Sequence, residues 1–370
     1  MRIGLPSAGT RRSTGLVGLA ILVAGSVTVL APATAADTGG APGLPGVNPD
    51  PDPRSSSRAL ELLDRVASAH DLVRYAGVQF VSAWGPDSTD SRLVEIKNMP
   101  GQGTAIRVRG SGEGPAAAVF STAPGDTGIQ FGGGPVQLLA RNFSVSTAGK
   151  DQVTGRKTRV LEMAGEDGVL AARFWVDDRS GVLLRREVYD ASGRTVRASA
   201  FVQVRIGDRV SPGHLPPALP QTHAEELGVQ EVADLRESGC SCPALLVDRL
   251  TLYQVRWVST NTGTVLHLSY SDGLSTVSLF EQPGRVDQTT MVGYTPLVDE
   301  HGVQYVRDGL PQQVVWSADG VVYAVVADAP DPLVNEVVAG LPHEAPESDG
   351  VTSRIGRGLA RVGSWINPFA

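Results

Sequence analysis

The sequence has little cysteine and little lysine. Its two cysteines, Cys240 and Cys242, lie far from the N-terminus, which therefore carries no cysteine for lipid attachment. No histidine lies near them in the sequence, so we expect no zinc site. Only three of the basic residues are lysines, which is typical of a high-GC genome. The net charge of −7 argues against nucleic acid as a partner, because phosphate binding relies on cations.

The sequence also lacks the usual enzyme signatures. It contains no G-x-S-x-G, no H-E-x-x-H, no P-loop and no dinucleotide fingerprint. The six histidines are scattered, and no pair of carboxylates stands out as an acid–base couple. His267 falls inside a predicted strand, where we expect an exposed or hydrogen-bonded histidine, and Asp272-Gly273 is typical of a turn. We therefore expect no enzyme activity, no cofactor and no metal.

The two cysteines form the triplet Cys240-Ser241-Cys242. Outside the cytosol such a pair is expected to oxidise. A ring closed over one intervening residue is strained, which would make its disulfide more reducible than a structural bridge. The sequence predicts a local disulfide or two inert thiols, with a redox role as the alternative.

The N-terminus has the order of a secretory signal peptide. Three arginines precede a mostly apolar run over residues 15–31, and small residues follow this run. We predict export to the periplasmic or extracytoplasmic side of the membrane, with cleavage near Ala35. An uncleaved N-terminal anchor is the alternative, because the run nearly spans a bilayer. Loss of residues 1–35 would change the net charge from −7 to −10, since they contain three arginines and no acid.

The rest of the chain is predicted to form two α+β domains with antiparallel sheets. Ser56 or Ser57 can cap a helix, and short alternating segments separated by turn residues follow it. Four prolines then favour a linker. The predicted units are a signal peptide over 1–35, a disordered leader over 36–57, a first domain over 58–207, a Pro-rich linker over 208–226, a smaller second domain over 227–343, a polar spacer over 344–353 and an amphipathic tail over 354–370.

The tail would be a weak helix until it docks, because three glycines interrupt it. It has apolar residues on one side and arginines on the other. One interpretation is a helix that docks on its own protein, and the alternative is a helix that binds a membrane surface or a partner. The candidate residues for such contacts are Arg357, Leu359, Arg361, Trp365 and Phe369.

Apolar residues along the strands of the first domain indicate either a plain core or an apolar groove. A groove of this kind would suit an acyl chain or an apolar peptide. The candidate lining residues are Val78, Phe80, Trp84, Ile106, Val108 and Phe120.

Residues 174–207 carry six arginines and two similar turn sequences, DDRSG and YDASG. The glycines of these two turns, and Gly168 of the preceding Asp167-Gly168 turn, can take the left-handed conformation that closes a short hairpin. Because side chains alternate along a strand, Arg185 and Arg186 point to opposite faces and the arginines form no single basic patch. We expect most of them at turns or on a solvated outer face, with Glu187, Asp190 and Asp178 as partners.

Residues 59–207 resemble the MucB/RseB family of exported regulators of envelope-stress sigma factors. The most specific segment is a strand that ends in Trp-x-Asp, followed by a turn and GVLLRREVYDASG. The resemblance implies a LolA/LolB-like first domain, which is an unclosed antiparallel β-barrel with covering helices. It also implies a smaller α+β domain, which residues 227–343 match more in position than in sequence.

The same resemblance implies a binding function. In the family, the protein binds the exported part of a membrane-spanning anti-sigma factor and guards it from proteolysis until envelope damage is sensed. Lipid or lipoprotein would be the sensed ligand. The alternative is a carrier of lipid or lipoprotein of the LolA type.

Overall fold

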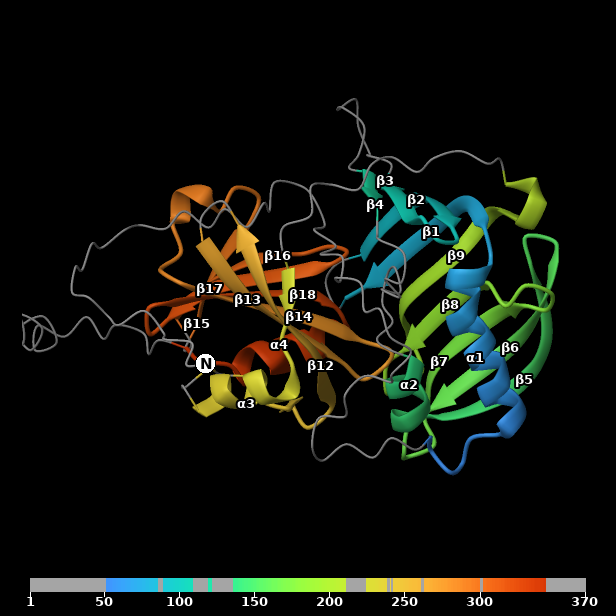
Figure 1. The fold of residues 1–370 in the computed structure, drawn as a ribbon, viewed down its shortest axis with the longest axis horizontal. Coiled ribbons are helices and arrows are strands. Elements are labelled where there is room, and N and C mark those ends of the chain that lie inside the picture. Colours follow the sequence, from blue (N-terminus) through green and yellow to red (C-terminus); the bar gives the residue numbers. More distant parts are fainter. Residues whose placement is uncertain are drawn as a thin grey trace, which may run out of the picture.

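The computed structural model describes residues 51–85, 89–108, 119–121, 136–210, 224–237, 240, 242–260, 263–299 and 302–343. Two large antiparallel sheets, each accompanied by helices, lie side by side in this part of the chain (Figure 1). The predicted α+β class with two antiparallel sheets is confirmed.

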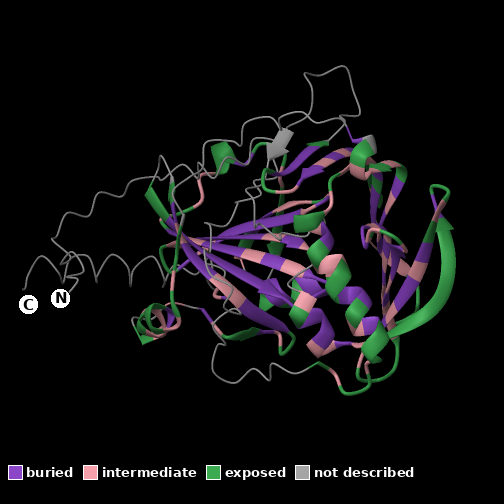
Figure 2. Cartoon of the chain, turned by 45° about the vertical axis from the view of Figure 1, so that its right-hand side comes forward, coloured by how far each residue is buried: buried purple, intermediate pink, exposed green. Residues whose placement is uncertain are grey.

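The first sheet contains the strands of residues 75–206. They are β1 (Tyr75–Trp84), β2 (Thr89–Met99), β3 (Gly103–Val108), β4 (Val119–Ser121), β5 (Ser144–Val153), β6 (Arg156–Ala164), β7 (Leu170–Asp177), β8 (Leu183–Tyr189) and β9 (Thr195–Ile206). Their order across the sheet is β4-β3-β2-β1-β9-β8-β7-β6-β5. Among the described strands β4 and β5 stay at opposite edges, so the sheet is open, as expected of an unclosed barrel. The edge strand β5 is exposed along most of its length (Figure 2).

Helices α1 (Ser57–Leu72) and α2 (Val136–Asn142) cover one face of this sheet (Figure 1). Ser56 caps α1, since its hydroxyl accepts a hydrogen bond from the Ala59 amide at 3.3 Å. The apolar side of α1 is buried because its residues recur at helical spacing. The buried residues that α1 and α2 share with the sheet include Ala59, Leu62, Leu63, Leu139, Phe143, Leu161, Met163, Ala172, Phe174 and Val188.

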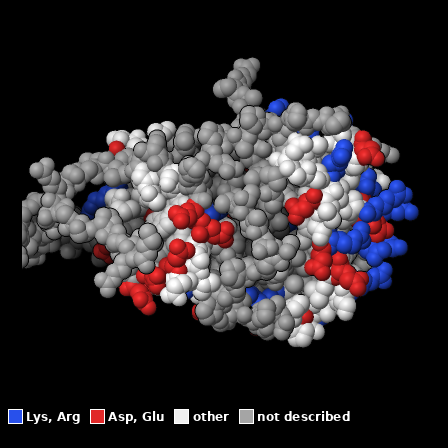
Figure 3. Space-filling model, viewed as in Figure 1, with Lys and Arg blue, Asp and Glu red and all other residues white. Residues whose placement is uncertain are grey.

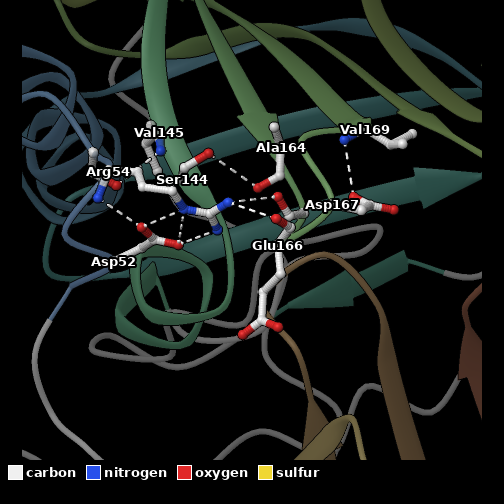
Figure 4. A network of polar contacts seen from close by, with 10 residues as sticks. Asp52, Arg54, Ser144, Val145, Ala164, Glu166, Asp167 and Val169 are labelled. Atoms are coloured by element: carbon white, nitrogen blue, oxygen red, sulfur yellow. Dashed lines mark hydrogen bonds and ion pairs between the residues drawn. The ribbon is translucent and has the colours of Figure 1, made fainter.

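The leader is ordered at its end, which corrects the expectation of disorder up to residue 57. The Arg54 guanidinium donates to the carbonyl of Glu166 at 2.9 Å and forms an ion pair with Asp52 at 2.6 Å (Figure 4). The Asp52 amide donates to the Ala140 carbonyl at 2.8 Å. Residues 52–56 are therefore held against α2 and the turn between β6 and β7, contacts that composition alone does not reveal.

The hairpin turn in DDRSG packs against α1. Gly181 has a φ of +77°, and a Cβ there would lie 2.8 Å from the Arg65 carbonyl oxygen. Glycine is thus required both for the left-handed backbone and for the close approach. Gly168 and Gly193 also have positive φ, which confirms all three predicted hairpin turns.

The second sheet contains the strands of residues 224–328. They are β10 (Ala224–Glu226), β11 (Leu245–Leu246), β12 (Leu250–Thr260), β13 (Gly263–Ser271), β14 (Thr276–Pro283), β15 (Thr295–Asp299), β16 (Gly302–Arg307), β17 (Gln312–Ala318) and β18 (Val321–Asp328). Their order is β10-β12-β13-β14-β18-β17-β16-β15, and β11 pairs with β12 off this path. Short 3-10 helices cover Gly207–Arg209 and Gln288–Thr290.

Helices α3 (Val229–Glu237) and α4 (Asp331–Ala339) belong to the core of the second sheet. α4 starts with Asp331-Pro332, where proline costs no backbone hydrogen bond. Trp316 is 1% exposed, and its indole nitrogen donates to the Pro342 carbonyl at 2.8 Å. This bond fixes the segment that follows α4.

Several predicted segments differ from the structure or lie outside its described part. The last three residues of the expected linker form β10, which pairs with β12, so the sheet begins before residue 227. The signal peptide, the spacer and the tail lie outside the described residues. Among the described helices, none has the length and apolar character needed to cross a bilayer.

Candidate binding site at the domain junction

The face of the first sheet under α1 and α2 carries two rows of cross-strand neighbours. One row contains Leu161, Phe174, Arg186 and Ser199, and the other contains Met163, Ala172, Val188, Arg197, Ala83 and Asp90. Because directly paired residues share a face, all of these side chains point to the same side of the sheet. We call this side the helix-covered face. It combines apolar residues with two arginines.

Two turns of the second domain reach the helix-covered face. Leu274, between β13 and β14, belongs to the same buried cluster as Leu139 and Phe174 and is 3% exposed. Leu310, between β16 and β17, belongs to a second cluster with Val81 and Ile106 and is 6% exposed. The apolar cores of the first domain are therefore completed by residues of the second domain.

The carboxylate of Asp272 shapes the turn that carries Leu274. It accepts hydrogen bonds from the amides of Leu274 at 2.8 Å and Ser275 at 2.6 Å, and it forms an ion pair with Arg249 at 2.8 Å. Asp272 is buried, and its charge is balanced by Arg249, which directly precedes β12. The predicted Asp-Gly turn is confirmed.

Gly273 sets the distance between this turn and α2. Its φ is +99°, and a Cβ would lie 2.3 Å from the backbone nitrogen of Leu139. The side-chain amide of Asn142 donates to the Asp272 carbonyl at 3.0 Å. The backbone of Gly273 in the second domain is thus packed directly against the backbone of Leu139 in the first domain.

Arg186 and Arg197 lie at the centre of the junction. The Arg197 guanidinium is 3.0 Å from the Asp328 carboxylate, and the Arg186 guanidinium is 3.8 Å from it. Arg186 also donates to the Leu274 carbonyl, and Arg197 donates to the carbonyl of Ala329. Burial lowers the pKa of Arg186, while the neighbouring Asp328 opposes this effect. Two arginines of the first domain therefore share one carboxylate of the second.

The expected solvated outer face is wrong for these two arginines, which are 5% and 6% exposed. They occupy the same rows as Phe174 and Val188, and the second domain covers this part of the face. The remaining arginines behave as predicted. Ion pairs join Arg185 to Glu187 and Arg194 to Asp190, while Asp178 pairs with Arg159 of β6, which lies outside this stretch. Acidic and basic side chains accordingly interleave on the surface of the first domain (Figure 3).

The turn between β16 and β17, which carries Leu310, is fixed at the edge of the helix-covered face. The Leu310 amide donates to the Asp90 carboxylate at 3.1 Å, and Arg92 forms an ion pair with this carboxylate at 2.9 Å. Asp90 ends the cross-strand row that contains Arg197. Both second-domain turns and Asp328 thus meet one continuous strip of the first sheet.

The structure does not bring the predicted groove residues together on one face. Ile106 is buried in the core that contains Leu310. Phe80 and Trp84 are 39% and 37% exposed and point to the opposite side, where Phe80 pairs with the exposed Leu93. Val78 is half-buried. Val108 and Phe120 belong to β3 and β4, but their side chains lie outside the described residues.

The other candidate residues are placed as follows. Cys240 and Cys242 are free thiols in this structure. Arg357, Leu359, Arg361, Trp365 and Phe369 of the tail lie outside the described residues. No group of three or more metal-binding side chains gathers in the part of the chain that the structure describes.

His267 is a buried sheet histidine with hydrogen-bonding neighbours. Its ring stacks on Phe280 at 4.4 Å, and Nε2 lies 3.3 Å from the Ser269 hydroxyl. Burial, with the nearby Arg256, lowers the pKa of His267 to about 3. The ring is therefore neutral near neutral pH, and its position is structural.

Sequence reasoning missed Asp328, Leu274 and Leu310 as junction residues. The strand alternation did contain a signal for Arg186, which falls in phase with the buried Leu184 and Val188, but not for Arg197, whose nearest neighbours in phase are Thr195 and Ser199. No feature of the neighbouring sequence identifies Asp328 as their partner, since it is the last residue of an ordinary apolar strand.

Comparison with known proteins gives one family match. Residues 120–219 match the MucB/RseB N-terminal domain family. Solved structures that match this chain include MucB in complex with MucA(peri), with 17% identity and a TM-score of 0.44, and the MucA/MucB complex of Pseudomonas aeruginosa, with 17% identity and a TM-score of 0.42. Each covers 78% of this chain and 100% of its own. A LolA superfamily protein of Nitrosomonas europaea has 13% identity and a TM-score of 0.20, with 43% of this chain and 94% of its own covered. No curated protein matches the sequence.

Proposed function

We propose that this chain, whose residues 120–219 belong to the MucB/RseB N-terminal domain family, is an exported regulatory protein that binds the exported part of a membrane anti-sigma factor. The family match is the observation that carries the proposal. It covers β5 to β9, and therefore both arginines of the junction. The predicted signal peptide supports a location outside the cytoplasm.

The geometry supports binding rather than catalysis. At the junction, Asp272 is committed to shaping a turn and Asp328 to two guanidinium groups. His267 is buried and neutral. These three groups hold the protein together, since Asp272 and Asp328 form ion pairs with guanidinium groups and the His267 ring stacks on Phe280.

The finer part of the proposal is that lipid or lipoprotein is sensed at the junction. An acyl chain would take the place of apolar contacts such as those of Leu274 on the helix-covered face. An anionic head group would compete with Asp328 for Arg186 and Arg197, since guanidinium groups bind carboxylate and phosphate well. Ligand binding would then loosen the contact between the domains.

The test combines biochemistry with genetics. Tagged protein expressed in its own host should co-precipitate a membrane anti-sigma factor, and deletion of its gene should change transcription of that sigma factor's regulon. A variant with Glu162→Gln, which alters only a surface ion pair, serves as the matched control for variants at the junction. An unchanged regulon together with co-purified acyl chains in mass spectra would overturn the regulatory proposal and favour a lipid carrier.

A further inference from the structure

The two cysteines lie beside a carboxylate and a guanidinium in the second domain. Cys240 Sγ is 4.0 Å from Oε2 of Glu281, which projects from β14. Cys242 Sγ is 3.8 Å from the Cys240 carbonyl oxygen, and the Arg236 guanidinium donates to the Cys242 carbonyl at 2.7 Å. The segment after α3 therefore places two thiols beside the Glu281 carboxylate of β14 and the Arg236 guanidinium of α3. None of these groups takes part in the domain junction.

The two thiols differ in access. Cys242 is 1% exposed and belongs to the core of the second domain, whereas Cys240 is half-buried at its margin. An external molecule can therefore reach Cys240 first. Cys242 is placed to react with whatever Cys240 has bound, because only one residue separates them in the sequence.

The charges around the pair favour proton transfer near neutral pH. Burial, with the charge of Cys242, raises the pKa of Glu281 to about 7. A hydrogen bond from the Cys240 thiol and the charge of Arg236 lower the pKa of Cys242 to about 7. The pKa of Cys240 is raised because it donates to Cys242 and is desolvated, so Cys240 needs a base in order to react. Tyr270 and Tyr323 also face this group, and burial raises the pKa of each phenol.

We propose that Cys240 and Cys242 form a thiol–disulfide exchange site for low-molecular-weight disulfides, with Cys240 as the attacking thiol, Glu281 as its proton acceptor and Cys242 as the resolving thiol. A half-buried carboxylate 4.0 Å from the Cys240 thiol fits this role better than a packing role. Its Oε1 is buried without a hydrogen-bond partner, which is costly unless the group is used.

The exchange takes place in two balanced steps. Cys240 Sγ attacks one sulfur of the disulfide RS–SR, its proton passes to Glu281, and RS⁻ leaves with the electron pair of the broken S–S bond. The Cys242 thiolate then attacks Sγ of Cys240 and expels the second RS⁻. Each RS⁻ takes up a proton, so one disulfide is reduced to two thiols while Cys240 and Cys242 are oxidised to a disulfide.

The reduced full-length protein can be tested with the aromatic disulfide DTNB. We expect wild type to release two thionitrobenzoate ions per chain, and intact mass should show no retained adduct and a loss of two hydrogens. Cys242→Ser should release one ion and retain one adduct on Cys240. Two retained adducts on wild type, or no reaction in native protein whose denatured form reacts, would overturn the proposal.

The role of Glu281 is tested by the pH profile. Glu281→Gln should slow the release of the first ion at neutral pH by roughly tenfold, since base assistance is lost. Its rate should then rise only at the higher pH where Cys240 ionises alone. Glu336→Gln, on the exposed side of α4, is the matched control and should react like wild type. The rates are compared only if the melting curve of Glu281→Gln matches that of wild type. Equal rates for the two proteins would then refute the assignment of Glu281 as the proton acceptor.

Discussion

Removal of the Asp328 carboxylate should weaken the domain junction strongly. Asp328→Asn keeps the shape of the side chain but leaves Arg186 and Arg197 without their shared negative charge. Both arginines are more than nine-tenths buried, and the Asp328 side chain is only 15% exposed. Loss of one partner of a buried ion pair costs about 3–5 kcal/mol, because the remaining charge is uncompensated. We expect the free energy of unfolding to fall by about 3 kcal/mol.

Urea titration followed by circular dichroism and tryptophan fluorescence measures this change. Trp84 and Trp175 lie in the first domain, and Trp257 and Trp316 lie in the second. Variants that keep only Trp175 or only Trp316 should therefore show separate transitions if the junction opens before the sheets unfold. Glu162→Gln is the matched control. Its partner Arg173 is 42% exposed, and removal of such a surface pair should cost no more than about 1 kcal/mol.

Two results would contradict the expected role of Asp328. If Asp328→Asn costs no more than Glu162→Gln, the junction does not depend on this pair and the reasoning is refuted. The double variant Arg197→Met with Asp328→Asn should be less destabilised than the sum of the single changes, since the unpaired charge is removed together with its partner. Full additivity would show that the two groups act independently.

Three further results are expected at other positions. Gly273→Ala should cost about 1–3 kcal/mol in urea titrations, because its Cβ would overlap the backbone of Leu139, whereas Gly101→Ala has open space and should cost less. Leu310→Ala should lower the free energy of unfolding by about 2–5 kcal/mol, since it leaves a cavity in the first domain. His267 has a folded pKa of about 3, below its unfolded value of about 6.5, so its contribution to stability is complete above the unfolded pKa and is lost as the pH falls from there towards 3. His267→Gln should therefore reduce the loss of stability between neutral pH and pH 4, as measured by thermal melts, and an unchanged slope would contradict this cause.

The elements of the fold follow from local sequence. Alternating residues and Gly-containing turns predict the strands around Gly168, Gly181 and Gly193, and these glycines do have positive φ. Ser56 caps the predicted helix. These features depend on neighbours a few residues apart, and so composition and period are sufficient to find them.

The junction depends on distant residues and could not be predicted in the same way. Arg197 donates to a carbonyl 132 positions away, and Arg186 to one 88 positions away. A charged residue in an alternating strand is usually solvated, and only the position of the second domain reverses this expectation. The leader shows the same limit, since Arg54 is ordered by carbonyl groups 111 and 112 positions away.

The two domains share their apolar cores. Each of the two apolar clusters in the first domain contains a leucine that the second domain supplies, Leu274 in one and Leu310 in the other. Between these two anchors lies the single carboxylate of Asp328, which balances two buried guanidinium groups. Separation of the domains would therefore expose apolar surface to water, which is unfavourable, and would also break the ion pairs of Asp328. A ligand that opens the junction must replace both kinds of contact, which an anionic amphiphile does and a neutral or purely apolar molecule does not.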